Sequence, residues 1–366
     1  MPFESDILKF KAYTYTSNIS PVTPTDQVIN LIKKSDGYYG VAENKILIKV
    51  HSAALNPFDS GLYNSAHPIF EWIFGQQGIG RDYSGVIADI GDTAAAQTGF
   101  KVGDEVAGLY THPFGKGTVS EYIEVNPQVE KSIVKKPTNL DFNEAASFPL
   151  VYGTAHSMLS NYDVKDKSIL VLGGSTSVGK YLVQLAKLRG AKTIATTNSP
   201  KSNELVTSLG STHQIDYTKS KNLLNPVLEA VKELGEFDYI FDTCGNSDLF
   251  AQISTILKPR STGSAYLTCV GDYKFDYNTI NGFQVLYGRL GPLIRTLWGK
   301  LGYGIDYSYV LLKPGKGWIE DAKNEFEKGQ LLVCIDSVYQ WEDFNEAFKK
   351  LKSNKANGKL VIVISS

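Results

Sequence analysis

Short apolar runs alternate with helical segments between residues 150 and 315. Lys167–Gly173 is an apolar run that ends at glycine, which is typical of a buried parallel strand. Val178–Leu188 follows with apolar positions at helical spacing. Further strands are predicted at 193–197, 214–217, 238–242, 264–270 and 307–313, and helices at 200–209, 223–234 and 249–257. Strands that alternate with helices of about ten residues predict right-handed crossovers and a doubly wound parallel sheet, so the fold class is α/β.

The first 150 residues follow a different pattern, with short β-rich runs separated by Gly, Pro and Asp. Strands are predicted here at 45–51, 83–90, 105–109 and 120–125. This spacing favours a compact, mostly β domain. The tail predicts a helix at 317–328, a strand at 335–339, a helix at 342–351 and a last strand at 359–364.

Composition and charge argue against several classes of function. A length of 366 residues suits about two domains. The net charge of −1 argues against a general nucleic-acid binder, which would carry a basic surplus. No apolar stretch is long enough to span a bilayer. The three cysteines are far apart, so they form neither a disulfide framework nor a zinc-binding pair. The amino-terminal segment lacks a secretory core and contains acids, which favours the cytoplasm and leaves contact with an organelle surface open.

The segment 272–315 is rich in Tyr, Trp, Leu and Gly, and within 282–301 its only charges are Arg289, Arg295 and Lys300. One interpretation is a peripheral contact with a membrane or lipid surface. The other is a lid over a pocket or part of a subunit interface, which we favour because aromatic patches mark protein contacts. Proline and several glycines argue against one long amphipathic helix.

The turn between the first predicted strand and helix of this region is suited to phosphate. A helix amino terminus offers unpaired N–H groups and a partial positive charge, and small residues let the backbone approach a pyrophosphate. The candidate cofactor-binding residues of the turn are Gly173, Gly174, Ser175, Thr176, Ser177, Val178 and Gly179. The alternative is a tight glycine turn without a ligand. Gly245 and Gly271 follow later strands at the same sheet edge and join the candidates.

The end of the second strand indicates which dinucleotide binds. An NAD enzyme commonly has an acid there, whereas this chain has no acid from 196 until Glu204. Hydroxyl groups and a cation would accept a 2′-phosphate, which favours NADPH. The candidates for this contact are Thr197, Ser199, Lys201 and Tyr217. The alternative for Lys201 is the start of a solvated helix.

The order of motifs resembles the quinone-oxidoreductase-like branch of the medium-chain dehydrogenase/reductase superfamily, including fungal enone-reductase-like and reticulon-interacting proteins. The matching stretches are 52–59, 80–86, 102–108, 145–149, 153–155, the phosphate turn and 356–361. The resemblance implies a GroES-like domain at 1–150, completed by 317–366, and a Rossmann domain at 151–316. It also implies reduction of quinones or α,β-unsaturated carbonyls, and a homodimer.

Zinc members of the superfamily have Gly-His-Glu where this chain has Gly80-Arg81-Asp82, and the first domain has no cysteine. Catalytic zinc needs three N, S or O ligands. His51, His67, His112 and His156 are conceivable ligands, but none is paired at metal spacing, so we expect no metal. Arg81 and Asp82 suggest either an ion pair or a catalytic role. The chain departs from the family at Gly174 and Ser177 in the phosphate turn.

A third departure is Gly61, where many relatives carry the Tyr or Lys that reaches the substrate. The candidate catalytic residues are Asn56 at the nicotinamide or substrate, Thr154 near the nicotinamide and Tyr63 as proton donor. Asn56 could instead be a turn residue, Thr154 could cap the helix that follows, and water could supply the proton in place of Tyr63. The sequence predicts an NADPH-dependent, zinc-independent reductase. The alternative function is an NADPH-binding scaffold with little turnover, at a lipid surface or in a protein complex.

Overall fold

The computed structural model describes residues 3–35, 37–112, 114–282, 284, 288 and 290–365. Contacts within the chain divide it into two compact units. The first unit comprises Met1–Leu150, Asp276–Gly282 and Pro314–Ser366, and the second comprises Val151–Phe275 and Phe283–Lys313. Compared with the division expected from the sequence, the segments 276–282 and 314–316 lie with the first unit rather than with the Rossmann domain.

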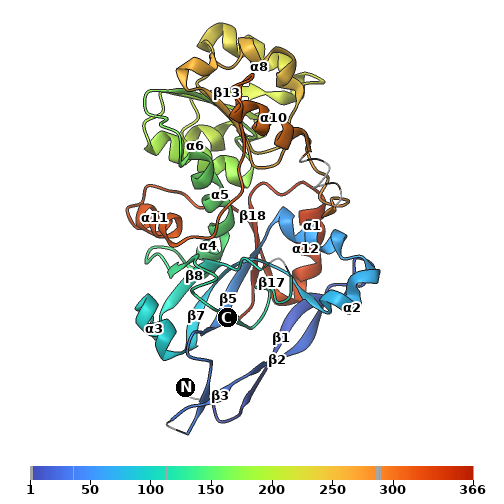
Figure 1. The fold of residues 1–366 in the computed structure, drawn as a ribbon, viewed down its shortest axis with the longest axis vertical. Coiled ribbons are helices and arrows are strands. Elements are labelled where there is room, and N and C mark those ends of the chain that lie inside the picture. Colours follow the sequence, from blue (N-terminus) through green and yellow to red (C-terminus); the bar gives the residue numbers. More distant parts are fainter. Residues whose placement is uncertain are drawn as a thin grey trace. The chain divides into compact units, whose positions relative to one another are not determined.

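The first unit contains a sheet in which the strands run in the order β10-β8-β7-β5-β18-β17, and β9 also pairs with β5. Their bounds are β5 Ile46–Leu55, β7 Asp82–Ile90, β8 Glu105–Leu109, β9 Tyr122–Val125, β10 Ile133–Lys135, β17 Ile335–Gln340 and β18 Lys359–Val363. The C-terminal strand β18 lies antiparallel beside β5, with Leu360 opposite Leu55 (Figure 1). The tail therefore completes the sheet of the first unit.

Apolar residues of the tail close the core of this sheet. Helix α12 (Phe344–Lys352) places Phe344, Phe348 and Leu351 on one face at helical spacing, and all three are buried. They pack against buried residues of β5 and β18. A second sheet, with the order β2-β1-β6, includes β1 (Ile7–Tyr15) and β2 (Thr23–Asn30), which the sequence reading did not predict.

The remaining elements of the first unit are short strands and helices around these sheets. They are β3 Ile32–Lys33, β4 Tyr39–Gly40, α1 Pro57–Ser65, η1 Pro68–Phe70, α2 Glu71–Phe74, β6 Gln77–Gly78, α3 Asp92–Thr98, α4 Phe142–Ser147, α11 Lys316–Glu327 and η6 Trp341–Asp343. Helix α5 (Pro149–Leu159) spans the division between the units.

The second unit is built on a parallel sheet with strand order β13-β12-β11-β14-β15-β16. The strands are β11 Ser168–Leu172, β12 Thr193–Asn198, β13 His213–Asp216, β14 Tyr239–Asp242, β15 Ala265–Thr268 and β16 Asp306–Tyr309. Their connections contain α6 Ser177–Leu188, η2 Pro200–Ser202, α7 Asn203–Leu209, η3 Tyr217–Lys219, α8 Leu224–Leu234, η4 Asp248–Thr255 and η5 Arg260–Thr262. The strand order reverses between β11 and β14, the place where doubly wound sheets bind ligands. The expected α/β class and parallel sheet are confirmed.

One connection differs from the sequence prediction. The helix expected at 249–257 is the 3-10 segment η4, which is interrupted by non-helical backbone at Gln252. Within 272–315, where proline argued against a long helix, α10 (Leu290–Lys300) forms. Pro292 lies within α10. A short helix is therefore compatible with that proline.

Candidate functional site

The phosphate turn lies between β11 and α6, as expected. Thr176 caps α6, because its Oγ1 accepts a hydrogen bond from the Gly179 N–H at 2.9 Å. Ser177 and Val178 complete the first helical turn, where N–H groups have no acceptor within the helix. The turn is braced from β12, since the Gly173 N–H donates to Thr197 Oγ1 at 2.8 Å. This is the arrangement that favours an anion at a helix amino terminus.

The glycines of the turn leave no space for side chains. A Cβ on Gly179 would lie 2.1 Å from the Gly173 carbonyl oxygen, so the helix sits directly on the turn. A Cβ on Gly174 would lie 2.6 Å from Thr196 Cβ on β12. Gly173 has φ of +81°, a conformation that favours glycine. Gly174 therefore lies where there is little room for a methyl group.

The end of β12 carries an amide instead of a carboxylate. Asn198 is buried, and its Nδ2 donates to Asn203 Oδ1 at 2.7 Å while its Oδ1 accepts from Thr196 Oγ1 at 2.8 Å. Lys201 is exposed in η2, just beyond this strand end. Ser199 is the residue before η2, and Tyr217, the first residue of η3, is about half exposed. Thr197, by contrast, is buried and uses its hydroxyl to hold the phosphate turn.

Two further loops meet at the carboxyl edge of the same sheet. Asp242 ends β14, and its carboxylate accepts hydrogen bonds from the N–H groups of the loop that follows. Gly245 in this loop has φ of +80°, and a Cβ there would lie 2.1 Å from the Tyr273 carbonyl oxygen in the loop after β15. Gly271, in that second loop, has φ of +114° and lies beside Pro292 of α10. Gly245 is thus required for close backbone packing and Gly271 for its positive φ, and their contact with a cofactor stays a prediction.

The first unit contains a buried polar cluster at the start of α1. Lys359 Nζ donates to Asn56 Oδ1 at 2.5 Å and lies 2.7 Å from Asp82 Oδ2. Asn56 Nδ2 also donates to Asp82 Oδ2, at 2.9 Å, and the other Asp82 oxygen accepts from the Leu150 N–H. Asn56, Asp82 and Lys359 are at most 4% exposed. Asp82 therefore forms an ion pair with Lys359.

Asp59 extends this cluster into the helix. Its carboxylate accepts from the backbone N–H of Asn56 at 2.8 Å and of Gly80 at 3.1 Å. Burial raises the pKa of Asp59, while the nearby Arg81 opposes that shift. Asn56 is thus more than a turn residue before Pro57, because both ends of its amide hold neighbouring side chains.

The other two candidate catalytic residues lie in structured surroundings. The Tyr63 hydroxyl donates to the Ser20 carbonyl at 3.0 Å, and its ring packs edge-on against Tyr15 and Phe348. Thr154 is largely buried inside α5, well after the first residue of that helix, so it is not the helix cap that the sequence allowed. Asn56 and Tyr63 belong to the first unit and Thr154 to the second.

Comparisons with known proteins identify the family. Residues 42–138 match the alcohol dehydrogenase GroES-like domain, and residues 177–279 match the zinc-binding dehydrogenase domain. Protein YIM1 of Candida glabrata is 38% identical, covering 88% of this chain and 92% of that protein. Protein YIM1 of Saccharomyces cerevisiae is 33% identical, over 98% of both chains. The chain belongs to the YIM1 family of the medium-chain dehydrogenase/reductase superfamily.

Solved structures support the same fold. The quinone oxidoreductase from Coxiella burnetii has a TM-score of 0.74 at 22% identity, covering 98% of this chain and all of that chain. The human synaptic vesicle membrane protein VAT-1 homolog-like protein has a TM-score of 0.66 at 19% identity, covering 98% and 99%. At this level of identity these likenesses show the fold alone.

The name of the second matched domain raises the question of zinc. In the described part of the chain, no group of three or more His, Cys, Asp or Glu side chains could hold a metal ion. The polar cluster at α1 presents the amide of Asn56, the carboxylate of Asp82 and the ammonium of Lys359. A zinc ion there would repel the ammonium and compete for oxygens that already accept hydrogen bonds. These residues do not fit zinc.

Sequence reasoning overlooked two residues that organise these sites. Lys359 appeared only inside a family motif, and nothing local indicates that a lysine near the C-terminus is buried. Asp242 ended a predicted strand without being singled out. Its signal was available, because a carboxylate at the carboxyl end of a parallel strand lies at the edge where ligands bind.

Proposed function

We propose that the chain is a zinc-independent, NADPH-dependent reductase that transfers hydride to quinones or α,β-unsaturated carbonyl compounds. The observation that carries this proposal is the capped helix terminus at Thr176 beside a strand end without a carboxylate. Such a terminus attracts the pyrophosphate. The amide of Asn198 and the exposed ammonium of Lys201 suit a 2′-phosphate, which a carboxylate would repel.

When bound, the nicotinamide supplies the hydride, and the chain positions the reactants and excludes water. The turn from Gly173 to Gly179 would hold the pyrophosphate, and Thr154 would contact the nicotinamide. Asn56 acts through its bonds to Asp82 and Lys359, which fix the start of α1. Tyr63 donates the final proton only by giving up its bond to Ser20, so water is the competing donor.

The test is oxidation of NADPH by the purified protein, followed at 340 nm with 9,10-phenanthrenequinone and a series of 2-alkenals. We expect turnover with NADPH and much less with NADH. Lys201→Glu should raise the KM for NADPH about 10- to 100-fold, since a charge-assisted hydrogen bond contributes about 1.5–3 kcal/mol. Lys192→Glu is the matched control, because Lys192 is exposed just before the opposite end of β12. Equal use of NADH, or equal effects of the two variants, would refute the choice of cofactor.

A specific observation favours the second candidate function, an NADPH-binding scaffold on a lipid surface. Helix α10 and the residue after it expose an apolar stripe at helical spacing, while Pro292 and Gly299 face inward. The stripe consists of Leu290, Leu293, Ile294, Leu297, Trp298 and Leu301, each about half exposed or more. Between Asp276 and Asp306 the sequence has three basic and no acidic residues. An apolar face with aromatic and basic residues suits the surface of an anionic bilayer.

We place the protein in the cytoplasm, with reversible contact to an organelle surface through this stripe. In the described residues, no helix is long and apolar enough to cross a membrane. Flotation with phosphatidylserine-containing vesicles should recover the protein, and substituting Leu293, Ile294 and Leu297 by serine should abolish recovery. Ile19→Ser is the control, since Ile19 is exposed on the first unit.

In the expected homodimer, a second copy of the chain could cover the stripe in place of a lipid surface. Light scattering after gel filtration separates the two cases. A dimer that the serine variant dissociates, without vesicle binding by either protein, would assign the stripe to a second copy and refute the lipid contact. NADPH binding without turnover across the quinone and alkenal series would favour the scaffold over the reductase.

A further inference from the structure

A buried carboxylate organises the sheet edge next to the phosphate turn. Asp242 is fully buried at the end of β14, and within the described residues no lysine, arginine or histidine pairs with it. Its oxygens accept from the N–H groups of Cys244 at 3.0 Å, Gly245 at 2.9 Å and Asn246 at 2.9 Å. The Tyr266 hydroxyl donates as well, at 3.1 Å. Backbone dipoles thus replace the missing counter-ion.

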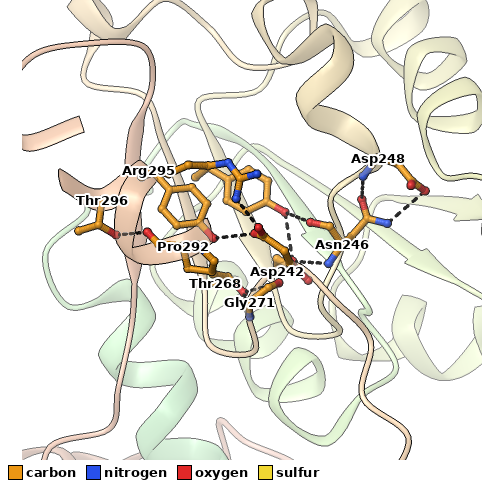
Figure 2. Close-up of polar contacts among 11 residues, drawn as sticks. Asp242, Asn246, Asp248, Thr268, Gly271, Pro292, Arg295 and Thr296 are labelled. Atoms are coloured by element: carbon orange, nitrogen blue, oxygen red, sulfur yellow. Dashed lines mark hydrogen bonds and ion pairs between the residues drawn. The ribbon is translucent and has the colours of Figure 1, made fainter. Parts of the chain in front are cut away.

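These contacts determine the shape of the loop. Three successive N–H groups, of Cys244, Gly245 and Asn246, converge on this one side chain. Figure 2 shows the chain of hydrogen bonds that runs from Asp242 through Asn246 to Asp248. The loop also packs so closely on the Tyr273 backbone that Gly245 cannot carry a Cβ. The position of residues 244–246 therefore depends on the carboxylate of Asp242.

The residue after Asp242 connects this loop to the phosphate turn. Thr243 Oγ1 lies 2.7 Å from Thr176 Oγ1, the helix cap, and donates to the Leu172 carbonyl at 2.8 Å. A Cβ on Gly173 would lie 2.9 Å from Thr243 Oγ1 and 3.1 Å from Cys244 Cβ. Displacement of the loop would therefore displace the groups that receive the pyrophosphate.

We propose that Asp242 is the positioning residue of the dinucleotide site, and that its ionised form holds the loop and the phosphate turn in the shape that binds the cofactor. The inference rests on the proposed cofactor binding, and it adds that the affinity for the cofactor depends on pH. A protonated Asp242 would present a hydroxyl group to neighbours that are almost all donors. The loop would then have to rearrange, and the cofactor would bind more weakly.

Asp242 is the group of this cluster that titrates near neutral pH. Burial raises its pKa to about 6, although the bonds from Cys244, Gly245 and Asn246 oppose the rise. The thiols of Cys244 and Cys269 and the phenols of Tyr266 and Tyr307 all have pKa values raised by burial, so they stay protonated at physiological pH. The other charged groups that face the cluster are Asp248, Lys274 and the Asp272–Arg295 ion pair, which joins the loop after β15 to α10.

The experiment is binding of NADP⁺ and NAD⁺ by quenching of intrinsic fluorescence, from pH 8 to pH 5. The 2′-phosphate of NADP⁺ itself titrates near pH 6, so NAD⁺ provides the profile without that group. For one group with a pKa of about 6, the Kd for NAD⁺ should rise about tenfold between pH 8 and pH 5. Asp242→Asn should weaken binding by at least about tenfold at pH 8 and flatten this profile. Glu229→Gln, at an exposed acid of α8, should behave like the wild type.

The outcomes separate this inference from the proposed function. If the wild type binds neither dinucleotide at any pH, the proposed cofactor fails. If it binds and Asp242→Asn binds equally well with the same profile, the role of Asp242 is refuted. A loss of stability alone would weaken binding without removing the pH dependence. If the variant does not fold, the pH profile of the wild type still tests the proposal. A Kd for NAD⁺ that does not change between pH 8 and pH 5 would overturn it.

Discussion

Lys359→Met removes the cation from the buried cluster of the first unit and leaves its partner in place. Asp82 would keep its bonds from Asn56 Nδ2 and the Leu150 N–H, but its charge would lose the ammonium at 2.7 Å. Both groups are almost fully buried, at 4% exposure for Lys359 and 0% for Asp82. Removal of one partner of a buried ion pair costs about 3–5 kcal/mol, because the remaining charge is uncompensated.

The assay is unfolding in urea, with the free energy extrapolated to water. Lys355→Met, at an exposed lysine just before β18, should change the free energy by less than about 0.5 kcal/mol. Adding Asp82→Asn to Lys359→Met should recover part of the loss, since the uncompensated charge is gone. A cost below about 1 kcal/mol for Lys359→Met, or no recovery in the double variant, would refute the view that this pair is electrostatically coupled.

Three further changes probe other parts of the chain. Gly245→Ala should weaken dinucleotide binding at least about tenfold, because a Cβ would lie 2.1 Å from the Tyr273 carbonyl oxygen; fluorescence quenching measures this. Thr176→Val should destabilise the protein by about 1 kcal/mol through loss of the helix cap, measured by urea unfolding. The hydrogen bond from Lys323 lowers the pKa of Glu327, so the pair stabilises the fold at neutral pH. Lys323→Met should cost up to about 1 kcal/mol at pH 7, and the difference should vanish as the pH falls below about 4 in urea titrations.

The fold of the second unit could be predicted because its elements carry local signals. Short apolar runs placed β11, β12 and β14 to within a residue or two. The exception was η4, where an apolar pattern at helical spacing forms a kinked 3-10 segment. Here the tertiary structure decided an outcome that local propensity left open.

The candidate site likewise has features that could be predicted from the sequence and features that could not. The phosphate turn was found from the sequence, because its small residues stand directly between a strand and a helix. The hydrogen bond from the Gly173 N–H to the Thr197 hydroxyl was not predicted, and contact of Thr197 with a phosphate stays a prediction. The bonds of the Asn56 amide to Lys359 and Asp82 were not predicted either, and its contact with the nicotinamide or substrate stays a prediction. A side chain's hydrogen bonds to distant residues cannot be read from its neighbours in the chain.

The sequence by itself determined the α/β class, the parallel sheet and the phosphate turn, because each depends on residues that are adjacent or follow a short period. Only the tertiary structure decided which charges are buried and what they hold. Lys359 and Asp82 lie far apart in sequence and meet because β18 completes the sheet beside β5. Asp242 gains its role because the loops after β14 and β15 pack against each other at Gly245. Such contacts form because whole helices and strands bury their apolar surfaces against one another. The sequence of one short segment does not show which distant element it will pack against.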